Sequence, residues 1–208
     1  MTTRRLQDFT GVGYDKGRSP AWQIAWWVVS HLVFQAWWCP ARTRPTILRT
    51  FGAEVGRGCN IRNGVKVHWP WKLAVGEHCW IGEGVWLLNL EPIMIGDQVC
   101  ISQEAFLCTG SHRRRDPNFE YDNAPIVVGE GAWVALRAIV LRGATVPADG
   151  LVPAGVVFQQ EGSAPEITRP SSPEGQLKQT RGGKAPSSPL PWPDATSNVA
   201  GQSRGGRT

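Results

Sequence analysis

The feature that most constrains this chain is a period of six in its aliphatic residues. Two shifts of two residues and one longer interruption divide the period into four sets: Val55, Ile61, Val67, Leu73; Val75, Ile81, Leu87, Ile93; Ile95, Ile101, Leu107; and Val128, Val134, Val140, Val146, Val152. A helix repeats about every 3.6 residues and a strand every second residue, so neither explains the pattern. Short strands joined by turns, with one inward aliphatic on each side of a triangular coil, do explain it. The sequence therefore predicts an all-β fold, a parallel β-helix.

Small residues occupy two further positions of the repeat. Glycine follows several of the aliphatics, as at Gly56 and Gly82, and we expect these glycines to supply the positive φ that turns require. Four positions after many aliphatics stands a small or β-branched residue, such as Cys59 or Ala105, which we expect to line the wall of the coil.

The repeat divides the chain into three regions. We assign residues 51–160 to the β-helix domain, with residues 111–125 as a loop that interrupts it, and residues 1–50 to an N-terminal segment with a Trp-rich helix. From 161 to 208 the chain is rich in Gly, Pro and Ser and poor in large apolar residues. Such a segment buries too little surface to offset its ordering entropy, so we expect a disordered C-terminal tail.

The Trp-rich stretch at residues 21–38 is the one candidate membrane element. A membrane-spanning helix needs about 20 predominantly apolar residues, and polar residues such as Gln23 and His31 argue against one here. The tryptophans, followed by Arg42 and Arg44, suit a helix that lies in the interface of an anionic leaflet, as a peripheral contact. The alternative is a helix that caps the core of the domain, and this alternative is slightly favoured.

Charge and cysteine content exclude several classes of protein. The net charge of +5 is modest, which weakly favours anionic ligands and does not indicate nucleic-acid binding. The five cysteines form no C-x-x-C pair, and the largely polar start of the chain is unlike a secretory signal. We therefore expect a cytoplasmic protein, placed at most at the inner face of the membrane.

Several motifs in and around the repeat resemble those of one family. They are Leu6-Gln7-Asp8-Phe9, Leu48-Arg49-Thr50-Phe51-Gly52-Ala53, Trp69-Pro70-Trp71-Lys72-Leu73, Trp80-Ile81-Gly82-Glu83 and Leu107-Cys108-Thr109-Gly110-Ser111-His112. Over roughly residues 6–157 the chain resembles the colanic acid biosynthesis acetyltransferases, which are hexapeptide-repeat acyltransferases. The resemblance implies a left-handed β-helix and a homotrimer with active sites between its subunits. It also implies acetyl transfer from acetyl-CoA to a hydroxyl of a glycan or lipid-linked sugar in exopolysaccharide biosynthesis.

The resemblance assigns roles to five residues. It places the catalytic histidine on His112, and Asn89 stands where many relatives have an asparagine that faces the acceptor. Trp133, Ala135 and Ala154 lie in the coils where the family binds the pantetheine arm of the cofactor. Imidazole ionises near neutral pH, so it suits the task of taking the acceptor's hydroxyl proton. The plain alternatives are a loop histidine without a role and ordinary packing of the coil.

Some residues depart from the family pattern. Pro147 and Pro153 lack backbone N–H groups, so we expect the ladder to end early. Gln159 stands where a basic residue is expected near the cofactor. These departures keep a second hypothesis open, a catalytically impaired β-helix scaffold without a complete coenzyme A site.

The remaining histidines do not form a metal site in the sequence. His68 and His78 are far from His112 along the chain, and no second histidine accompanies His112, so we expect no metal and place both on the surface. The run of arginines at residues 113–115 fits either phosphate binding or a solvated loop.

Overall fold

The chain folds as a three-sided parallel β-helix preceded by helices. The computed structural model describes residues 5–159, and the predicted tail lies outside the described residues. The helices are η1 (Leu6–Asp8), α1 (Pro20–Val29), the π-helical turn η2 (Ser30–Phe34), α2 (Arg44–Thr50) and η3 (Pro70–Lys72). The all-β prediction and the Trp-rich helix are thereby confirmed.

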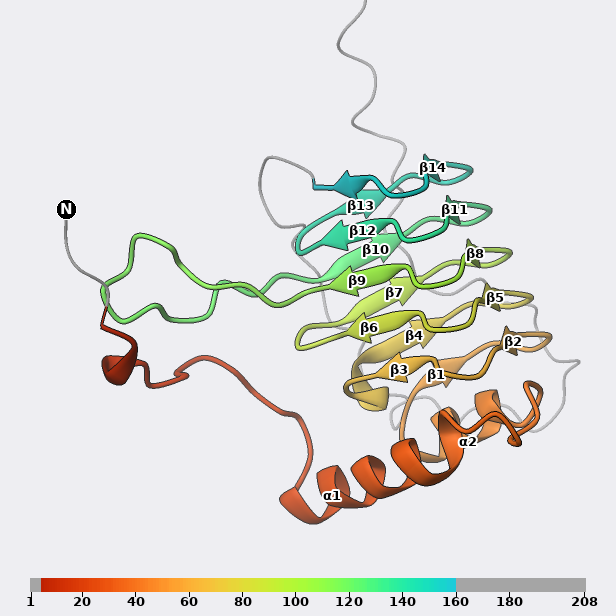
Figure 1. Cartoon of the computed structure of the whole chain (residues 1–208), viewed down its shortest axis with the longest axis horizontal. Coiled ribbons are helices and arrows are strands. Elements are labelled where there is room, and N and C mark those ends of the chain that lie inside the picture. The colour runs from red at the N-terminus through yellow and green to blue at the C-terminus, as the bar shows by residue number, and fades with distance from the viewer. Residues whose placement is uncertain (1–4, 160–208) are drawn as a thin grey trace, which may run out of the picture. The chain divides into compact units, whose positions relative to one another are not determined.

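Three parallel sheets form the sides of the β-helix. Sheet A contains β1 (Glu54–Val55), β4 (Leu73–Val75), β7 (Ile93–Ile95), β10 (Ile126–Val128) and β13 (Thr145–Val146). Sheet B contains β2 (Asn60–Ile61), β5 (Trp80–Ile81), β8 (Cys100–Ile101), β11 (Trp133–Val134) and β14 (Leu151–Val152). Sheet C contains β3 (Lys66–Val67), β6 (Trp86–Leu88), β9 (Phe106–Cys108), β12 (Ile139–Leu141) and β15 (Val157–Phe158). Every third strand therefore joins the same sheet, and the coils stack as layers (Figure 1).

The repeating aliphatics fill the interior. Strand register places like on like, because Ile81 pairs with Ile101 and Leu87 pairs with Leu107. All of the predicted inward positions are buried except Val55, which is half-buried. The two-residue shifts fall within strands of sheet A, where Leu73 and Val75 both point into the core from the two ends of β4.

The prediction that Gly56 and Gly82 supply positive φ was wrong. Gly56 and Gly82 are absent from the residues with positive φ, which include Gly58 and Gly84 instead. A Cβ on Gly56 would lie 2.5 Å from the backbone of Gly76, and one on Gly82 would lie 2.7 Å from the backbone of Gln103. Glycine is needed at these corners because successive coils approach too closely for a side chain.

The early end of the ladder was also a wrong prediction. β14 pairs with β11 and β15 pairs with β12, so the ladder continues beyond both prolines. Pro147 and Pro153 come directly after β13 and β14, at turn positions. The carbonyl of Pro147 accepts a hydrogen bond from the N–H of Gly150 at 3.0 Å, and this bond closes the turn without a proline N–H.

The N-terminal helices cover the first coil. Trp26 is buried, packs against Phe34 and Phe51, and donates its indole N–H to the carbonyl of Val67 at 3.1 Å. Arg44 is also buried, and its guanidinium donates to the carbonyls of Phe34, Ala36 and Ile61 at 2.7–3.1 Å. A buried charge must be hydrogen-bonded, and these bonds fasten the helical segment to β2.

Candidate active site

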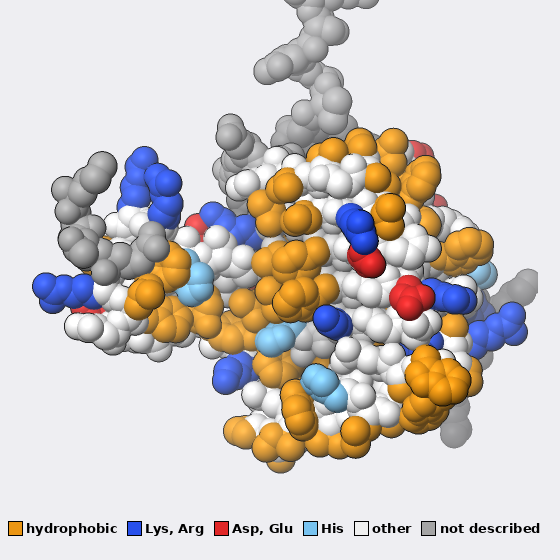
Figure 2. Space-filling model, viewed as in Figure 1, with side chains coloured by type: hydrophobic (Ala, Val, Ile, Leu, Met, Phe, Trp, Pro, Cys, Tyr) orange, Lys and Arg blue, Asp and Glu red, His pale blue; other side chains and the backbone are white. Residues whose placement is uncertain are grey.

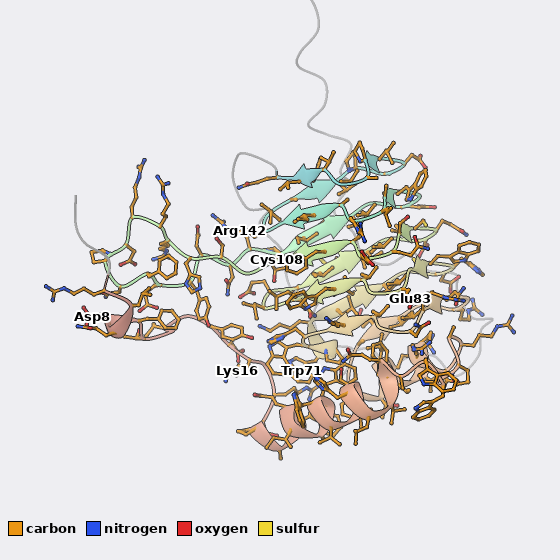
Figure 3. All side chains as sticks on the ribbon, in the orientation of Figure 1. Asp8, Lys16, Trp71, Glu83, Cys108 and Arg142 are labelled. Carbon is orange, nitrogen blue, oxygen red and sulfur yellow. The ribbon has the colours of Figure 1, made fainter. Side chains whose placement is uncertain are left out.

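His112 lies on an arm that leaves the β-helix between β9 and β10. At the root of the arm, Ala124 donates its N–H to the carbonyl of Thr109 at 3.0 Å, and Asp122 donates to the carbonyl of Ser111 at 2.8 Å. His112 and Tyr121 then form an antiparallel bridge. Arg142, at the end of β12, pairs with the carboxylate of Asp122. The arm extends outward beside the N-terminal segment, with Cys108 and Arg142 near its root and Asp8 at its far end (Figure 3).

Aromatic rings hold the imidazole of His112 in place. Its ring stacks on Phe119 with 4.3 Å between centroids and on Tyr121 with 5.1 Å, and Phe9 meets it edge-on at 5.6 Å. We call these four residues the histidine cluster. Nδ1 of His112 lies 2.8 Å from the carbonyl oxygen of Phe119. A carbonyl can only accept, so Nδ1 carries a proton, and in the neutral imidazole Nε2 is the nitrogen that holds the lone pair.

The N-terminal segment completes this arrangement from more than a hundred residues away in the sequence. The carboxylate of Glu120, on the arm, accepts hydrogen bonds from the N–H and hydroxyl of Thr10 at 3.0 and 2.7 Å and from the N–H of Gly11 at 3.1 Å. These bonds, the hydroxyl of Thr10 first, lower the pKa of Glu120. Arg5 also donates its N–H to the carbonyl of Pro117 at 3.1 Å. The segment therefore holds Phe9 against His112.

Sequence reasoning proposed His112 but missed the residues that position it. Phe119, Tyr121 and Glu120 lie in the loop that interrupts the repeat, where no periodicity indicates which side chains meet. The one available signal was the motif Leu6-Gln7-Asp8-Phe9, which carries the resemblance although it lies far outside the repeat.

The structure places Asn89 inside the protein. Its side chain is fully buried, and its amide oxygen accepts from the N–H groups of His68 and Trp69 at 3.1 and 3.0 Å. Its amide nitrogen donates back to the carbonyl of Trp69 at 2.6 Å. Trp69 in turn donates to the hydroxyl of Tyr14, whose ring lies 5.2 Å from that of Tyr121. Asn89 is thus connected to the histidine cluster through Trp69 and Tyr14.

The other predicted site residues lie elsewhere on the prism. Trp133 is half exposed on β11, and its indole donates to the hydroxyl of Ser102 at 2.8 Å. Ala135 is buried just after β11 and Ala154 is exposed just after β14. Figure 1 shows β11 and β14 on the side away from the arm. Within one chain, these three residues are therefore not brought together with His112.

The remaining titratable candidates separate into two groups. His68 is half-buried rather than at the surface as expected, and burial, followed by the charges of Lys72 and Lys16, lowers its pKa to about 4. His78 is exposed, as are the arginines at 113–115. Across residues 5–159, no group of three or more His, Cys, Asp or Glu side chains is arranged to hold a metal ion.

Comparison with known proteins gives relatives in both sequence and fold. No family model matches the sequence. A protein of Escherichia coli (strain K12) named as the colanic acid biosynthesis acetyltransferase WcaF is 39% identical over 153 residues, covering 71% of this chain and 82% of that protein. The protein of the same name from Shigella flexneri matches to the same extent.

Two solved structures share the fold. A maltose O-acetyltransferase from Clostridium difficile 630 aligns with a TM-score of 0.62 and 21% identity, over 76% of this chain and 87% of that one. A hexapeptide-repeat acetyltransferase from Vibrio cholerae, solved with acetyl coenzyme A, aligns with a TM-score of 0.63 and 22% identity, over 74% and 86%.

Proposed function

Because the chain belongs to the colanic acid biosynthesis acetyltransferase family, we propose that it moves an acetyl group from acetyl-CoA to a hydroxyl of a glycan or lipid-linked sugar in exopolysaccharide assembly. The observation that carries the proposal is the hydrogen bond between Nδ1 of His112 and the carbonyl of Phe119. This hydrogen bond makes Nε2 the acceptor of the neutral imidazole, and stacking on Phe119 and Tyr121 fixes the orientation of the ring. The Vibrio cholerae relative, solved with acetyl coenzyme A, supports the choice of donor.

His112 acts in this proposal as general base. Nε2 takes the proton of the acceptor hydroxyl while the hydroxyl oxygen attacks the thioester carbonyl carbon. The tetrahedral intermediate collapses with cleavage of the carbon–sulfur bond, and the imidazolium returns the proton to the departing thiolate. The products are the acetyl ester and free coenzyme A, so no acyl-enzyme is needed.

Replacing the histidine tests the proposal. We expect His112→Ala to lower kcat by roughly a hundred- to ten-thousandfold, measured as thiol release with a glycan acceptor. Acetyl-CoA binding should persist, since the lost interaction belongs chiefly to the transition state. His78→Asn is the matched control, because His78 is exposed outside the histidine cluster. Near-normal turnover by His112→Ala would show that His112 is not the base.

The scaffold hypothesis makes a different prediction about the donor. A protein without a complete coenzyme A site should show no heat of binding when titrated with acetyl-CoA, even at saturating concentration. The enzyme should bind it at Trp133, Ala135 and Ala154, and the continuous ladder through β14 and β15 favours this outcome. Calorimetry on the wild-type chain separates the two hypotheses before any acceptor is known.

A homotrimer would bring the two halves of the site together. The arm with His112 and the residues proposed for the cofactor lie on different edges of one prism, so a neighbouring subunit must supply one of them. Sheet B presents exposed apolar side chains to such a neighbour, among them Trp80 and Trp133. Sedimentation equilibrium should give three chains per particle, and a monomer at micromolar concentration would contradict the shared site.

The outer face of the Trp-rich segment supports a peripheral membrane contact through residues 21–38. Ile24, Leu32 and Trp37 are 63%, 65% and 85% exposed, and the apolar surface continues along α1 (Figure 2). Besides the buried Arg44, residues 16–53 contain four Lys and Arg and no Asp or Glu. No helix within residues 5–159 has the length and hydropathy to cross a membrane.

Co-sedimentation with lipid vesicles tests the proposed peripheral contact. The protein should sediment with vesicles rich in phosphatidylglycerol, and the bound fraction should fall as salt is added. Equal binding to neutral vesicles would contradict the charge argument.

A further inference from the structure

A recess of about 340 Å³ lies between the helical segment and the first two strands of sheet C. Its walls come from α1 and η2 on one side and from β3, β6 and the residues that follow β3 on the other. It shares no lining residue with the histidine cluster. The volume falls at the lower end of the range of about 300–1,000 Å³ that is typical of small-molecule sites.

Four indoles line this recess: Trp26, which is buried, and Trp27, Trp69 and Trp86, which keep exposed surface. Neighbouring rings fix the orientation of two of them, because Trp69 stacks on Trp71 at 4.8 Å and Trp86 stacks on Phe106 at 4.7 Å. Trp27 is 63% exposed, and the imidazole of His31 packs against its ring with 4.8 Å between centroids. The recess therefore offers flat, rigid apolar faces to a ligand.

Polar side chains from the π-helical turn form its edge. The wide turn closes with a hydrogen bond from the N–H of Gln35 to the carbonyl of Ser30, and the Gln35 amide also donates to the Ser30 hydroxyl at 3.0 Å. Nδ1 of His31 lies 2.7 Å from the carbonyl of Trp27 and must donate to it, which leaves Nε2 as the ring nitrogen that can face a ligand. π-Helical turns are rare and occur often at functional sites. Here the turn places Ser30, His31 and Gln35 together on the recess.

The charge of the lining restricts the ligand further. The described residues around the recess include Lys66, whose ammonium lies 5.4 Å from the ring of Trp86, and no Asp or Glu. His68, which also lines the recess, is kept neutral by burial and by nearby lysines. A cationic ligand or a metal ion would find no counter-charge among these residues. An anionic ligand would find the ammonium of Lys66, and a neutral ligand needs no counter-charge.

We propose that this recess binds a saccharide ring, with Lys66 at its rim favouring an acidic sugar over a neutral one. A pyranose has an apolar C–H face, which suits the indole rings, and a rim of hydroxyls, which suits the amides and the imidazole at the edge. A carboxylate on the ring would pair with Lys66. Binding here requires neither acetyl-CoA nor His112.

The test measures binding of two probes to the full chain by ligand-observed NMR. We expect trigalacturonate to bind and maltotriose to bind more weakly. Trp27→Ala should weaken trigalacturonate binding about tenfold, and Lys66→Ala should remove the preference for the acidic probe. Trp27 and Lys66 are exposed, so circular dichroism of both variants should match the wild type.

Matched controls separate this site from the other proposals. Trp37→Ala removes an exposed indole outside the recess, and Arg62→Ala removes an exposed cation outside it, so both should bind trigalacturonate like the wild type. His112→Ala should also bind it, which distinguishes failure here from failure of the catalytic assignment. Absence of saccharide binding, or equal losses in Trp27→Ala and Trp37→Ala, would overturn the proposal. Vesicle binding that depends equally on both tryptophans, without saccharide binding, would assign the recess to a membrane-facing surface instead.

Discussion

The coils of the β-helix and the arm that carries His112 are held together in opposite ways. In the coils, each residue contacts its counterpart one layer away, and the same contact is repeated from layer to layer. In the arm, single contacts join distant segments, such as Glu120 to Thr10 and His112 to Phe9. The difference indicates that the coils provide stability, whereas the arm and the N-terminal segment provide the orientation of the proposed base.

The largest expected effect is a loss of stability in the coils. Leu107 is fully buried in β9, so Leu107→Ala should lower the free energy of unfolding by about 2–5 kcal/mol. Urea unfolding followed by circular dichroism measures this. A truncation to alanine in the arm, Phe119→Ala, should lower the free energy of unfolding much less, because Phe119 is only half-buried. Equal losses would show that the arm shares in the global stability.

A smaller effect should separate orientation from stability. Glu120→Gln removes the charge that strengthens the bonds from Thr10 and Gly11, so the N-terminal segment should loosen and kcat should fall about tenfold. The melting temperature and acetyl-CoA binding should change little. Glu83→Gln is the control, because Glu83 is exposed and lies on the far side of the coils from the arm (Figure 3). A wild-type kcat in Glu120→Gln would mean that the segment does not orient His112.

Acid should reproduce that loosening in the unmodified protein. The pKa of Glu120 is lower in the folded state than in the unfolded chain, so its contribution is fully present above its unfolded value near ~4.3. It is lost as the pH falls through the lowered value in the folded state. The buried polar side chains among the described residues are Ser30, Arg44, Asn89 and Thr109, which include no carboxylate. Limited proteolysis with an acid-stable protease should therefore cut residues 5–14 at a pH where the circular dichroism of the coils is intact. If cleavage and the loss of circular dichroism occurred in one shared pH transition, the prediction would be contradicted.

The smallest effect should come from an ion pair on the coil surface. Arg57 and Glu77 lie 3.2 Å apart, but their side chains are 87% and 43% exposed. Exposed pairs contribute about 0–1 kcal/mol, so Arg57→Ala should leave the melting curve almost unchanged. A loss that approached that of Leu107→Ala would show that surface charges, and not the repeated interior contacts, stabilise the coils.

The sequence predicted the coils, where contacts repeat, better than the arm, where they do not. The period of six identified the inward face of each strand from β1 to β14 because each layer repeats the same contact. The reason for Gly82 was missed, since its constraint comes from the backbone of Gln103 in the next coil and not from its own turn. Pro147 was misread because a turn position needs no N–H.

The partners of the candidate site could not be predicted in this way. His112 was found through a motif, but Phe9 and Glu120 act through contacts that occur once and join residues far apart in the sequence. The burial of Asn89 likewise depends on the turn after β3, whose N–H groups it binds. Such single, long-range contacts leave no periodic pattern.

The root of the arm has a consequence for how this protein can change. The chain leaves the coils after Thr109 and returns at Ala124, and the two residues are hydrogen-bonded to each other. β10 still pairs with β7 in the register that an uninterrupted coil would have. Because exit and re-entry lie side by side, the intervening residues act as a replaceable cassette. An arm of another length or sequence would leave and rejoin the coils at the same two residues, so recombination or engineering at this point would leave the register of the underlying prism unchanged.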